Sequence, residues 1–408
     1  MIMINYFKKS VLFGVMLTGV LNVHGQADST TYFKVQQLMD QAKKIYAPDK
    51  RLKLIEFAEA DVLANKYVLQ TTEPAVKEAL RPQLAQLNVD FSIQILPDAS
   101  VGTKIYGVVN LSVANLRTKP SHAAEMATQI LMGAQVDILQ KDGGDFRIRT
   151  PEGYIAWVPT SSIVAMDANE LENWKASKKL IYTAEFGRSY TSANPKSLRI
   201  SDLVYGDILK LTGEEGNYFK VEYPDKRSGY ILKTEATAFD SWLKTRKATS
   251  ETILSSAKSM MGLPYLWGGT SVKGVDCSGF TKTSFFMNGY VIPRDASQQV
   301  LHGDAVEILD SEGNFDPSLA LKNLKPADLL FFAAGKNTSP NARVTHVALY
   351  IGEGTFIHAA GTVRINSMLK DAENYDDFQT RSVVAARRYI GSQDSAIQKI
   401  EENTYYTK

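Results

Sequence analysis

An internal repeat is the feature that most constrains the fold of this chain. A segment that starts at Gly133 (GAQVDILQKDGGDFRIRTPEGYIAWV) aligns with one that starts at Gly206 (GDILKLTGEEGNYFKVEYPDKRSGYIL). Such self-similarity indicates one supersecondary unit used twice, and short alternating strands between Gly, Asp and Pro turns are typical of small β-barrels. Two unrelated β-rich segments with similar turns are the alternative. The aligned positions are Phe146 with Phe219, Ile148 with Val221, and Gly153-Tyr154-Ile155 with Gly229-Tyr230-Ile231.

Together with residues 115–120 (NLRTKP), the repeat resembles bacterial SH3-like domains. The resemblance places a first domain over 104–166 and a second over 178–240. The residues after each of them, 167–177 and 241–250, are expected to be connectors.

The first residues have the pattern of an export signal. Two lysines precede a nearly all-apolar run over 11–21 (VLFGVMLTGVL), and the small residues Val23 and Gly25 stand before Gln26. This order of charged, apolar and small residues is typical of a cleaved signal peptide, predicted here over 1–25. The apolar run is shorter than the ~20 residues that a membrane span needs. The mature protein is therefore expected outside the cytoplasm, in a periplasm or the medium, and not in a membrane.

Between this signal and the repeat, the pattern predicts a short helix and then a small α+β module. Residues 26–47 hold apolar side chains at helical spacing, and Pro48 ends the run. Over 48–103, apolar side chains first alternate with polar ones, then recur at helical spacing, and then alternate again, which predicts the order β-β-α-β. The residues that carry these patterns are Phe33, Leu38, Ala42 and Ile45, then Leu52, Leu54 and 66–71, then Val76, Leu80, Leu84 and Leu87, and finally Phe91, Ile93 and Ile95.

Residues 248–391 show mixed patterns. A helix is expected over 250–261, where Gly262 ends it, and a second helix starts at Cys277. Helices followed by antiparallel strands predict an α+β domain. The charged, aromatic residues 392–408 are expected to be a flexible tail. The expected strands lie at 328–333, 344–351, 355–360 and 382–389.

Cys277 is the only cysteine of the chain. Exported proteins normally pair their cysteines as disulfides, so a single one indicates an intermolecular bridge or a thiol kept for its reactivity. Its place at the start of a predicted helix favours reactivity, because the N–H groups of a helix N-terminus lower the pKa of a thiol.

Two histidines can supply a base for such a thiol. His346 begins one predicted strand and His358 lies in the next, with residues 352–354 (GEG) between them. If these three residues form the hairpin loop, facing residues have numbers that add to 706, and both rings lie on one face of the sheet. As diagonal neighbours, with Cα atoms roughly 7–8 Å apart, the two residues are within reach of a ring-to-ring hydrogen bond.

These residues belong to a series of motifs that resembles the NlpC family of cell-wall cysteine peptidases. The resemblance covers about 250–390 and implies a papain-like α+β catalytic domain. With tandem SH3-like domains before it, the chain is similar to the subgroup that cleaves γ-D-glutamyl bonds in stem peptides. The motifs, in order, are Tyr265-Leu-Trp-Gly-Gly, Asp276-Cys-Ser-Gly-Phe, Pro293-Arg-Asp-Ala-Ser-Gln-Gln, Pro326-Ala-Asp-Leu-Leu-Phe-Phe, His346-Val-Ala-Leu-Tyr-Ile-Gly and Phe356-Ile-His.

By this resemblance Cys277 is the nucleophile, His346 is its general base, and His358 orients His346. The oxyanion is expected at the backbone N–H of Cys277 and the hydroxyl of Tyr265. Nothing in this chemistry requires a metal ion or another cofactor. The expected substrate-binding residues are Asp276, Ser278, Arg294 and Asp295, together with Glu125 and Tyr154 of the first SH3-like domain, which read the amine of L-Ala.

The resemblance implies a hydrolase of the bond between γ-D-Glu and an L-diamino acid, diaminopimelate or lysine, in peptidoglycan stem peptides. Release of L-Ala-γ-D-Glu from free peptides is the expected reaction. The alternatives are an endopeptidase on the intact wall that is anchored by its SH3-like domains, a wall-peptide binding protein without activity, and an acyltransferase. The 46 basic and 44 acidic side chains nearly cancel, so no strong field favours nucleic acid as a partner.

Overall fold

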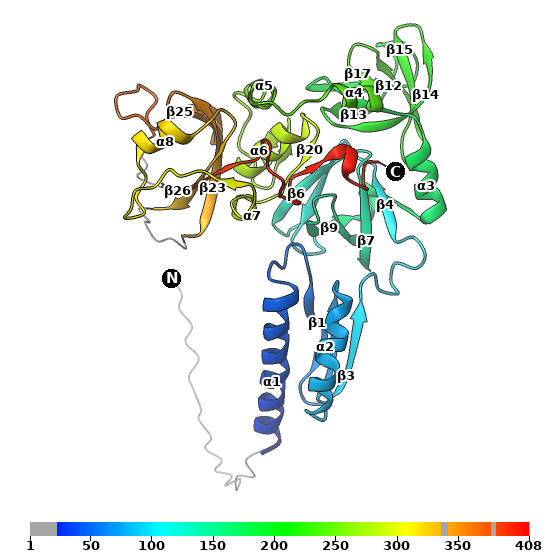
Figure 1. Ribbon diagram of the computed structural model, residues 1–408. Coiled ribbons are helices and arrows are strands. Elements are labelled where there is room, and N and C mark those ends of the chain that lie inside the picture. Colours follow the sequence, from blue (N-terminus) through cyan, green and yellow to red (C-terminus); the bar gives the residue numbers. More distant parts are fainter. Residues whose placement is uncertain (1–22, 336–341, 377–380, 408) are drawn as a thin grey trace, which may run out of the picture. The chain divides into compact units, whose positions relative to one another are not determined.

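The computed structural model describes residues 23–335, 342–376 and 381–407 (Figure 1). The chain divides into two compact units, Met1–Ile95 and Leu96–Lys408. The predicted signal peptide lies almost entirely outside the described residues, and the predicted cleavage point near Gln26 falls inside the first helix. Within the described ranges, no helix is long and apolar enough to cross a membrane.

The first unit contains a three-stranded sheet in the order β1-β2-β3. β2 pairs antiparallel with β1 and parallel with β3, and α2 makes the crossover that a parallel pair requires. Val35 and Met39 of α1 pack on Tyr67 of the sheet, whereas Phe33 is 61% exposed. The first strand begins later than expected, at Ile55. The bounds are α1 Val23–Tyr46, β1 Ile55–Asp61, β2 Lys66–Thr71, α2 Pro74–Ala85 and β3 Asp90–Ile95.

The second unit begins with a seven-stranded sheet in the order β10-β4-β7-β8-β9-β5-β6. Alternate strand residues such as Val136, Ile138 and Ile148 face inward and form one core. The backbone N–H of Asp98 donates to the carbonyl oxygen of Leu139, so the chain joins this sheet before the expected start at 104. The bounds are β4 Tyr106–Val109, β5 Val113–Arg117, β6 Met126–Leu131, β7 Gln135–Asp142, β8 Asp145–Arg149, β9 Ile155–Pro159, η1 Thr160–Ser162, β10 Ile163–Met166 and α3 Ala168–Ala176.

A further seven-stranded sheet, in the order β13-β12-β16-β15-β14-β11-β17, follows α3. Its buried residues, among them Leu209, Val221 and Ile231, form a separate core. A short helix, α4, then leads out of the sheet, where a connector was expected. The bounds are β11 Lys179–Tyr182, β12 Phe186–Tyr190, β13 Arg199–Val204, β14 Ile208–Glu215, β15 Tyr218–Glu222, β16 Ser228–Leu232, β17 Ala236–Ala238 and α4 Phe239–Thr245.

Strand pairing corrects one part of the repeat alignment. The facing pairs are Ile148 with Ala156 in the first sheet and Val221 with Gly229 in the second. A constant offset of 73 residues therefore relates the two sheets, and Gly229 corresponds to Ala156. The alignment of Gly153 with Gly229 is wrong, because it followed three matching letters instead of the strand register. Tyr154 consequently lies in the turn before β9, at the position that Arg227 occupies in the second copy.

Residues 250–391 form an α+β domain around a six-stranded sheet in the order β21-β26-β22-β23-β24-β25. One face packs on α5 and α6, with Ile253, Phe280 and Leu349 in the core. The other face packs on α8 through Phe332 and Ala320. The strand β25 was not predicted. The bounds are α5 Ser250–Ser259, β18 Thr270–Ser271, β19 Gly274–Val275, α6 Cys277–Phe286, β20 Tyr290–Val291, α7 Ala296–Gln299, β21 Asp304–Ala305, α8 Pro317–Asn323, β22 Leu329–Ala334, β23 Val344–Gly352, β24 Thr355–Ala360, β25 Thr362–Ser367 and β26 Arg381–Arg388.

The β23–β24 hairpin has the expected register for a different reason. Leu349 faces Ile357, a pair whose numbers add to 706 as expected. The loop, however, is a two-residue turn in which Glu353 and Gly354 both have positive φ, 50° and 76°. A bulge before Gly352 supplies the extra residue that restores the register.

The C-terminal residues are built into the fold, which contradicts the expectation of a flexible tail. The strand β27 (Gln398–Lys399) pairs with β20, and the short helix η2 (Ile400–Glu402) follows it. Ile400 is fully buried, and the Tyr405 hydroxyl donates to the Asp137 carboxylate 2.6 Å away. The sequence did not reveal this, because the segment has neither helical nor strand periodicity and is held by contacts with distant parts of the chain.

Candidate active site

Cys277 is the first residue of α6, and Asp276 caps that helix. The Asp276 carboxylate accepts the N–H of Gly279 2.7 Å away and the N–H of Gly268 2.9 Å away. The first bond satisfies an N–H group that has no partner within the first turn of the helix, and the second fixes the preceding loop to the same carboxylate. Gly279 has no room for a side chain, because a Cβ there would lie 1.9 Å from the carbonyl oxygen of Gly269. The start of α6 is therefore held rigidly against the loop that precedes it.

The Cys277 thiol is buried, with 7% of the residue exposed. Burial, followed by the negative charge of Asp276, raises the pKa of the thiol to about 12, although backbone N–H groups of Val347 and Ser278 act in the opposite direction. The expectation of a lowered thiol pKa is therefore wrong, because desolvation outweighs the helix N-terminus. Val347 directly follows His346 in β23, so this strand brings the predicted base to the start of α6.

His346 and His358 are hydrogen bonded, with 2.8 Å between Nε2 of the first and Nδ1 of the second. This confirms the contact expected from the hairpin register. His358 Nε2 lies 3.0 Å from the Oδ1 of Asn366. That oxygen is fixed as an acceptor by two further bonds: Arg364 Nε–H donates to it, while the Asn366 Nδ2 donates to the carbonyl oxygen of Asn374.

The hydrogen bonds that join His346, His358 and Asn366 determine which ring nitrogens carry a proton. Because Asn366 Oδ1 can only accept, His358 carries its proton on Nε2 and accepts through Nδ1. His346 must then donate from Nε2, which leaves Nδ1 as its basic atom. Burial keeps both rings neutral: it lowers the pKa of His346 well below its ordinary value and that of His358 to about 4, and the charge of Arg381 adds to both shifts.

Asn366 is a site residue that sequence reasoning missed, because β25 was not predicted. A usable signal was present, since residues 362–367 (TVRINS) alternate polar and apolar side chains. The register places Arg364 opposite His358, and Asn366, two residues further, lies on the same face of the sheet.

The predicted substrate-binding residues beside Cys277 form a buried ion-pair network. Arg294 is 1% exposed; its Nη2 lies 2.7 Å from the Asp276 carboxylate and its Nη1 lies 2.9 Å from the Ser278 hydroxyl. Its Nε donates to the Thr128 hydroxyl of β6, 2.6 Å away. Arg294 thus ties the nucleophile helix to the first seven-stranded sheet, and so deeply buried a guanidinium is not available for the direct substrate contact that was expected.

The other predicted site residues lie around this network. The Tyr154 hydroxyl donates to Asp295 Oδ2 3.3 Å away, which joins the first sheet to the catalytic domain. Burial raises the pKa of the Tyr265 phenol, and the charge of a Cys277 thiolate would raise it further, because the two side chains lie close together. Glu125 is exposed and directly precedes Met126, whose carbonyl oxygen would lie 2.9 Å from a Cβ at Gly268. The structure places Glu125 beside the loop before Cys277.

The neutral thiol leads to a testable pH dependence. We expect alkylation of Cys277 by iodoacetamide to be slow at acidic pH and to accelerate continuously between about pH 5 and pH 9, because only the thiolate reacts. Inactivation rates over this range measure the effect, with a small thiol run in parallel as a control for the reagent, and the single cysteine makes the modified site unambiguous. A rate that already reaches a plateau below about pH 6 would reveal a resting thiolate–imidazolium pair and contradict this account.

Comparison with known proteins supplies relatives of this architecture. Residues 262–382 match the NlpC/P60 family, and residues 116–163 match the bacterial dipeptidyl-peptidase SH3 domain. The chain is 30% identical to the gamma-D-glutamyl-L-lysine dipeptidyl-peptidase of Bacillus subtilis over 246 residues, which are 58% of this chain and 72% of that relative. Over 277 residues it is 26% identical to dipeptidyl-peptidase 6 of Lysinibacillus sphaericus, covering 64% and 91% of the two chains.

A solved structure shares the fold. The crystal structure of an NlpC/P60 family protein from Bacillus cereus superimposes with a TM-score of 0.56 and 24% sequence identity, over 70% of this chain and 99% of that one. An SH3-like domain followed by an NlpC/P60 catalytic domain is therefore the architecture of residues 116–382.

Proposed function

The chain belongs to the NlpC/P60 family of cysteine peptidases, and on that premise we propose that it hydrolyses the bond between γ-D-Glu and an L-diamino acid in peptidoglycan stem peptides. The names of its relatives support this bond. The proposed product is L-Ala-γ-D-Glu, released from peptides that have already left the glycan.

The contact between Tyr154 and Asp295 is the observation that carries the preference for free peptides. It brings the first SH3-like domain onto the rim of the catalytic site, beside a carboxylate whose side chain is 26% exposed. A partly exposed carboxylate favours an ammonium group, which a released stem peptide offers at its L-Ala residue. In the intact wall that amine is acylated by muramic acid, so it carries no charge and a bulky sugar follows it. We assign Asp295, Tyr154 and Glu125 to the reading of this amine.

The proposed mechanism starts from the neutral pair. His346 Nδ1 takes the thiol proton as Cys277 Sγ attacks the γ-carbonyl carbon, and the oxyanion is stabilised by the Cys277 N–H and the Tyr265 hydroxyl. His346 returns the proton to the departing amine of the diamino acid, which leaves a thioester on Cys277. Water, activated by the same imidazole, then hydrolyses the thioester. The bond to His358 holds His346 in the tautomer that these steps need.

Finer features of the architecture are part of this proposal. We take the second seven-stranded sheet as a second SH3-like domain, supported by its constant offset from the first sheet, and the first compact unit, which ends at Ile95 and not at 103, as a separate small module. We also propose that the chain is exported and acts in a periplasm or outside the cell. The charged and apolar order of the first 25 residues supports this.

Three substrates test the proposal. We expect rapid cleavage of L-Ala-γ-D-Glu-L-lysine or its diaminopimelate analogue, slow cleavage of the same peptide acetylated on L-Ala, and little release from polymeric wall, with products identified by mass spectrometry. The physical reason is the loss of a charged amine opposite Asp295, worth about tenfold or more. If polymeric wall were cleaved efficiently while the tripeptide was left uncleaved, the result would instead favour an endopeptidase anchored by its SH3-like domains.

A further inference from the structure

The turn that carries Tyr154 is unusually buried for a hairpin turn. Residues 150–154, here called the reading turn, are closed by a bond from the Thr150 N–H to the Tyr154 carbonyl oxygen and one from the Gly153 N–H to the Thr150 carbonyl oxygen. Tyr154 is 6% exposed, and the Glu152 side chain is 5% exposed. A surface loop of an isolated SH3-like domain would be solvated, so other elements must hold this turn.

The second seven-stranded sheet provides an internal comparison. Its equivalent turn, 223–227, has the same two backbone bonds, from Tyr223 N–H to the Arg227 oxygen and from Lys226 N–H to the Tyr223 oxygen. There Asp225 and Arg227, at the positions of Glu152 and Tyr154, have side chains that are 29% and 40% exposed. The backbone of the turn is therefore intrinsic to the repeat, whereas its deeper burial in the first copy comes from contacts with other elements.

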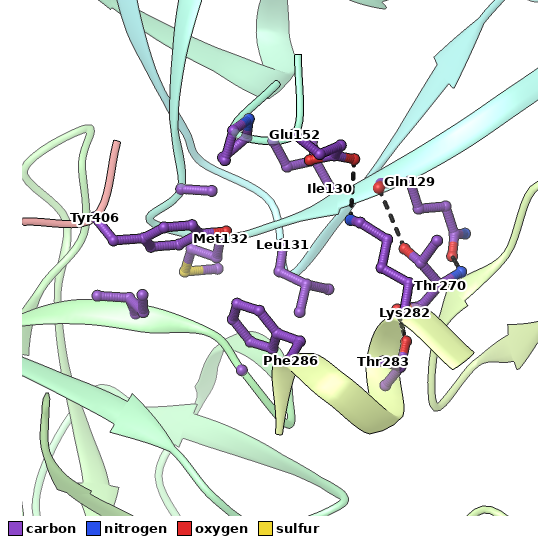
Figure 2. Close-up of a pocket in the computed structure, with 14 residues that line it drawn as sticks. Gln129, Ile130, Leu131, Met132, Glu152, Thr270, Lys282, Thr283, Phe286 and Tyr406 are labelled. Carbon is purple, nitrogen blue, oxygen red and sulfur yellow. Dashed lines mark hydrogen bonds and ion pairs between the residues drawn. The ribbon is translucent and has the colours of Figure 1, made fainter. Parts of the chain in front are cut away.

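One of these contacts comes from the nucleophile helix. Lys282 Nζ of α6 lies 3.0 Å from Glu152 Oε1, as an ion pair and not as an aligned hydrogen bond. Figure 2 shows Lys282 reaching across to Glu152, with Phe286 of the same helix beside Tyr406. The rings of Phe286 and Tyr406 are 5.9 Å apart. The helix that starts with Cys277 is thereby joined to the reading turn.

The other contact comes from the C-terminal residues 398–407, here called the clamp. Asn403, which is 3% exposed, donates from Nδ2 to the carbonyl oxygen of Pro151 in the reading turn, 3.2 Å away. The same Nδ2 donates to Gln398 Oε1 at 2.7 Å. The clamp is fixed at one end by the pairing of β27 with β20 in the catalytic domain, and at the other by the bond from Tyr405 to Asp137 in the first sheet.

We propose that the clamp is a specificity-determining part of the enzyme: by holding the reading turn against the catalytic domain, it sets the contact between Tyr154 and Asp295 and so the preference for an unblocked amine. This inference rests on the proposed function, because it deepens the role given there to Tyr154. None of the clamp residues touches the reacting atoms. Asn403 and Tyr405 are therefore positioning residues, and their loss should change substrate preference more than it changes the chemical step.

The test uses the full-length chain and the variants Asn403→Ala and Tyr405→Phe. We expect each to reduce the preference for the unblocked over the N-acetylated tripeptide about five- to tenfold, which is the usual effect of one lost hydrogen bond. The loss should appear as a higher KM for the unblocked peptide, with kcat largely retained. The rate of Cys277 alkylation should stay at the wild-type value, which separates a displaced turn from a damaged site.

Lys399→Ala is the matched control within the same segment. Its side chain is 47% exposed and pairs only with Glu401 and Glu402 in the described contacts, so we expect wild-type preference. If both Asn403→Ala and Tyr405→Phe kept the wild-type preference, or lost activity equally on the two peptides, the role proposed for the clamp would be wrong, while the proposed function would stand. Equal turnover of both peptides by the wild type would instead contradict the amine reading itself.

Discussion

Replacing Cys277 with serine is expected to lower kcat by about 10⁴-fold or more while leaving the fold intact. The thiol is the proposed nucleophile, and a serine hydroxyl is far harder to deprotonate by an imidazole whose pKa burial has already lowered. Cys277 also belongs to the core beneath the sheet, but the change from sulfur to oxygen removes little volume. Steady-state rates on the unblocked tripeptide measure the effect.

Thermal unfolding and peptide binding are the controls for this variant. Both Cys277→Ser and Cys277→Ala should keep a cooperative transition and bind the tripeptide with an affinity close to the wild-type KM. A wall-peptide binding protein without activity predicts something different, namely that wild type and variant are equally inert. Turnover within about tenfold of wild type in either variant would mean that another residue carries out the attack.

Replacing His358 with alanine is expected to lower kcat by about 10³- to 10⁴-fold, the scale seen when a catalytic imidazole loses the partner that sets its tautomer. His358 Nδ1 accepts the proton of His346 Nε2 at 2.8 Å. Without that acceptor, His346 can carry its proton on Nδ1, where it can no longer receive one from the thiol. Single-turnover rates on the tripeptide isolate the acylation step.

Two further variants test the separate contributions of the hydrogen bonds made by His358. A glutamine at position 358 can offer an oxygen to His346 Nε2–H, so His358→Gln should recover part of the lost activity. Asn366→Ala removes only the outer acceptor, 3.0 Å from His358. We expect it to lower kcat about ten- to hundredfold, which is the usual effect of removing a group that orients a functional histidine. If His358→Ala retained kcat within about threefold, the tautomer argument would be wrong.

The features that rest on periodicity or spacing were predictable from the sequence. The repeat predicted two β-rich segments, and the structure has two seven-stranded sheets with matching order. Cys277 at the start of a helix and the His346–His358 bond followed from helical spacing and from a hairpin register. Each of these features depends on residues close in sequence, where pattern and structure are directly linked.

The features that escaped prediction depend on long-range packing. The raised pKa of Cys277 comes from burial by distant strands, which a helix position alone does not reveal. Asn403 is buried against Pro151, a residue far away in the chain, so residues 392–408 were mistaken for a flexible tail. The repeat alignment was wrong at Tyr154 because it matched three identical residues instead of following the strand register. As a result, it did not show that this tyrosine lies in a turn.

Intact-mass analysis of the enzyme, quenched during turnover of the unblocked tripeptide, tests the central claim most directly. The account predicts a mass increase that matches one L-Ala-γ-D-Glu acyl group, carried by Cys277, with the diamino acid released before the dipeptide. Its absence from Cys277→Ala is the control. Release of the diamino acid by that variant, or an acyl group of any other composition on the wild type, would contradict a thioester mechanism at the γ-D-glutamyl bond.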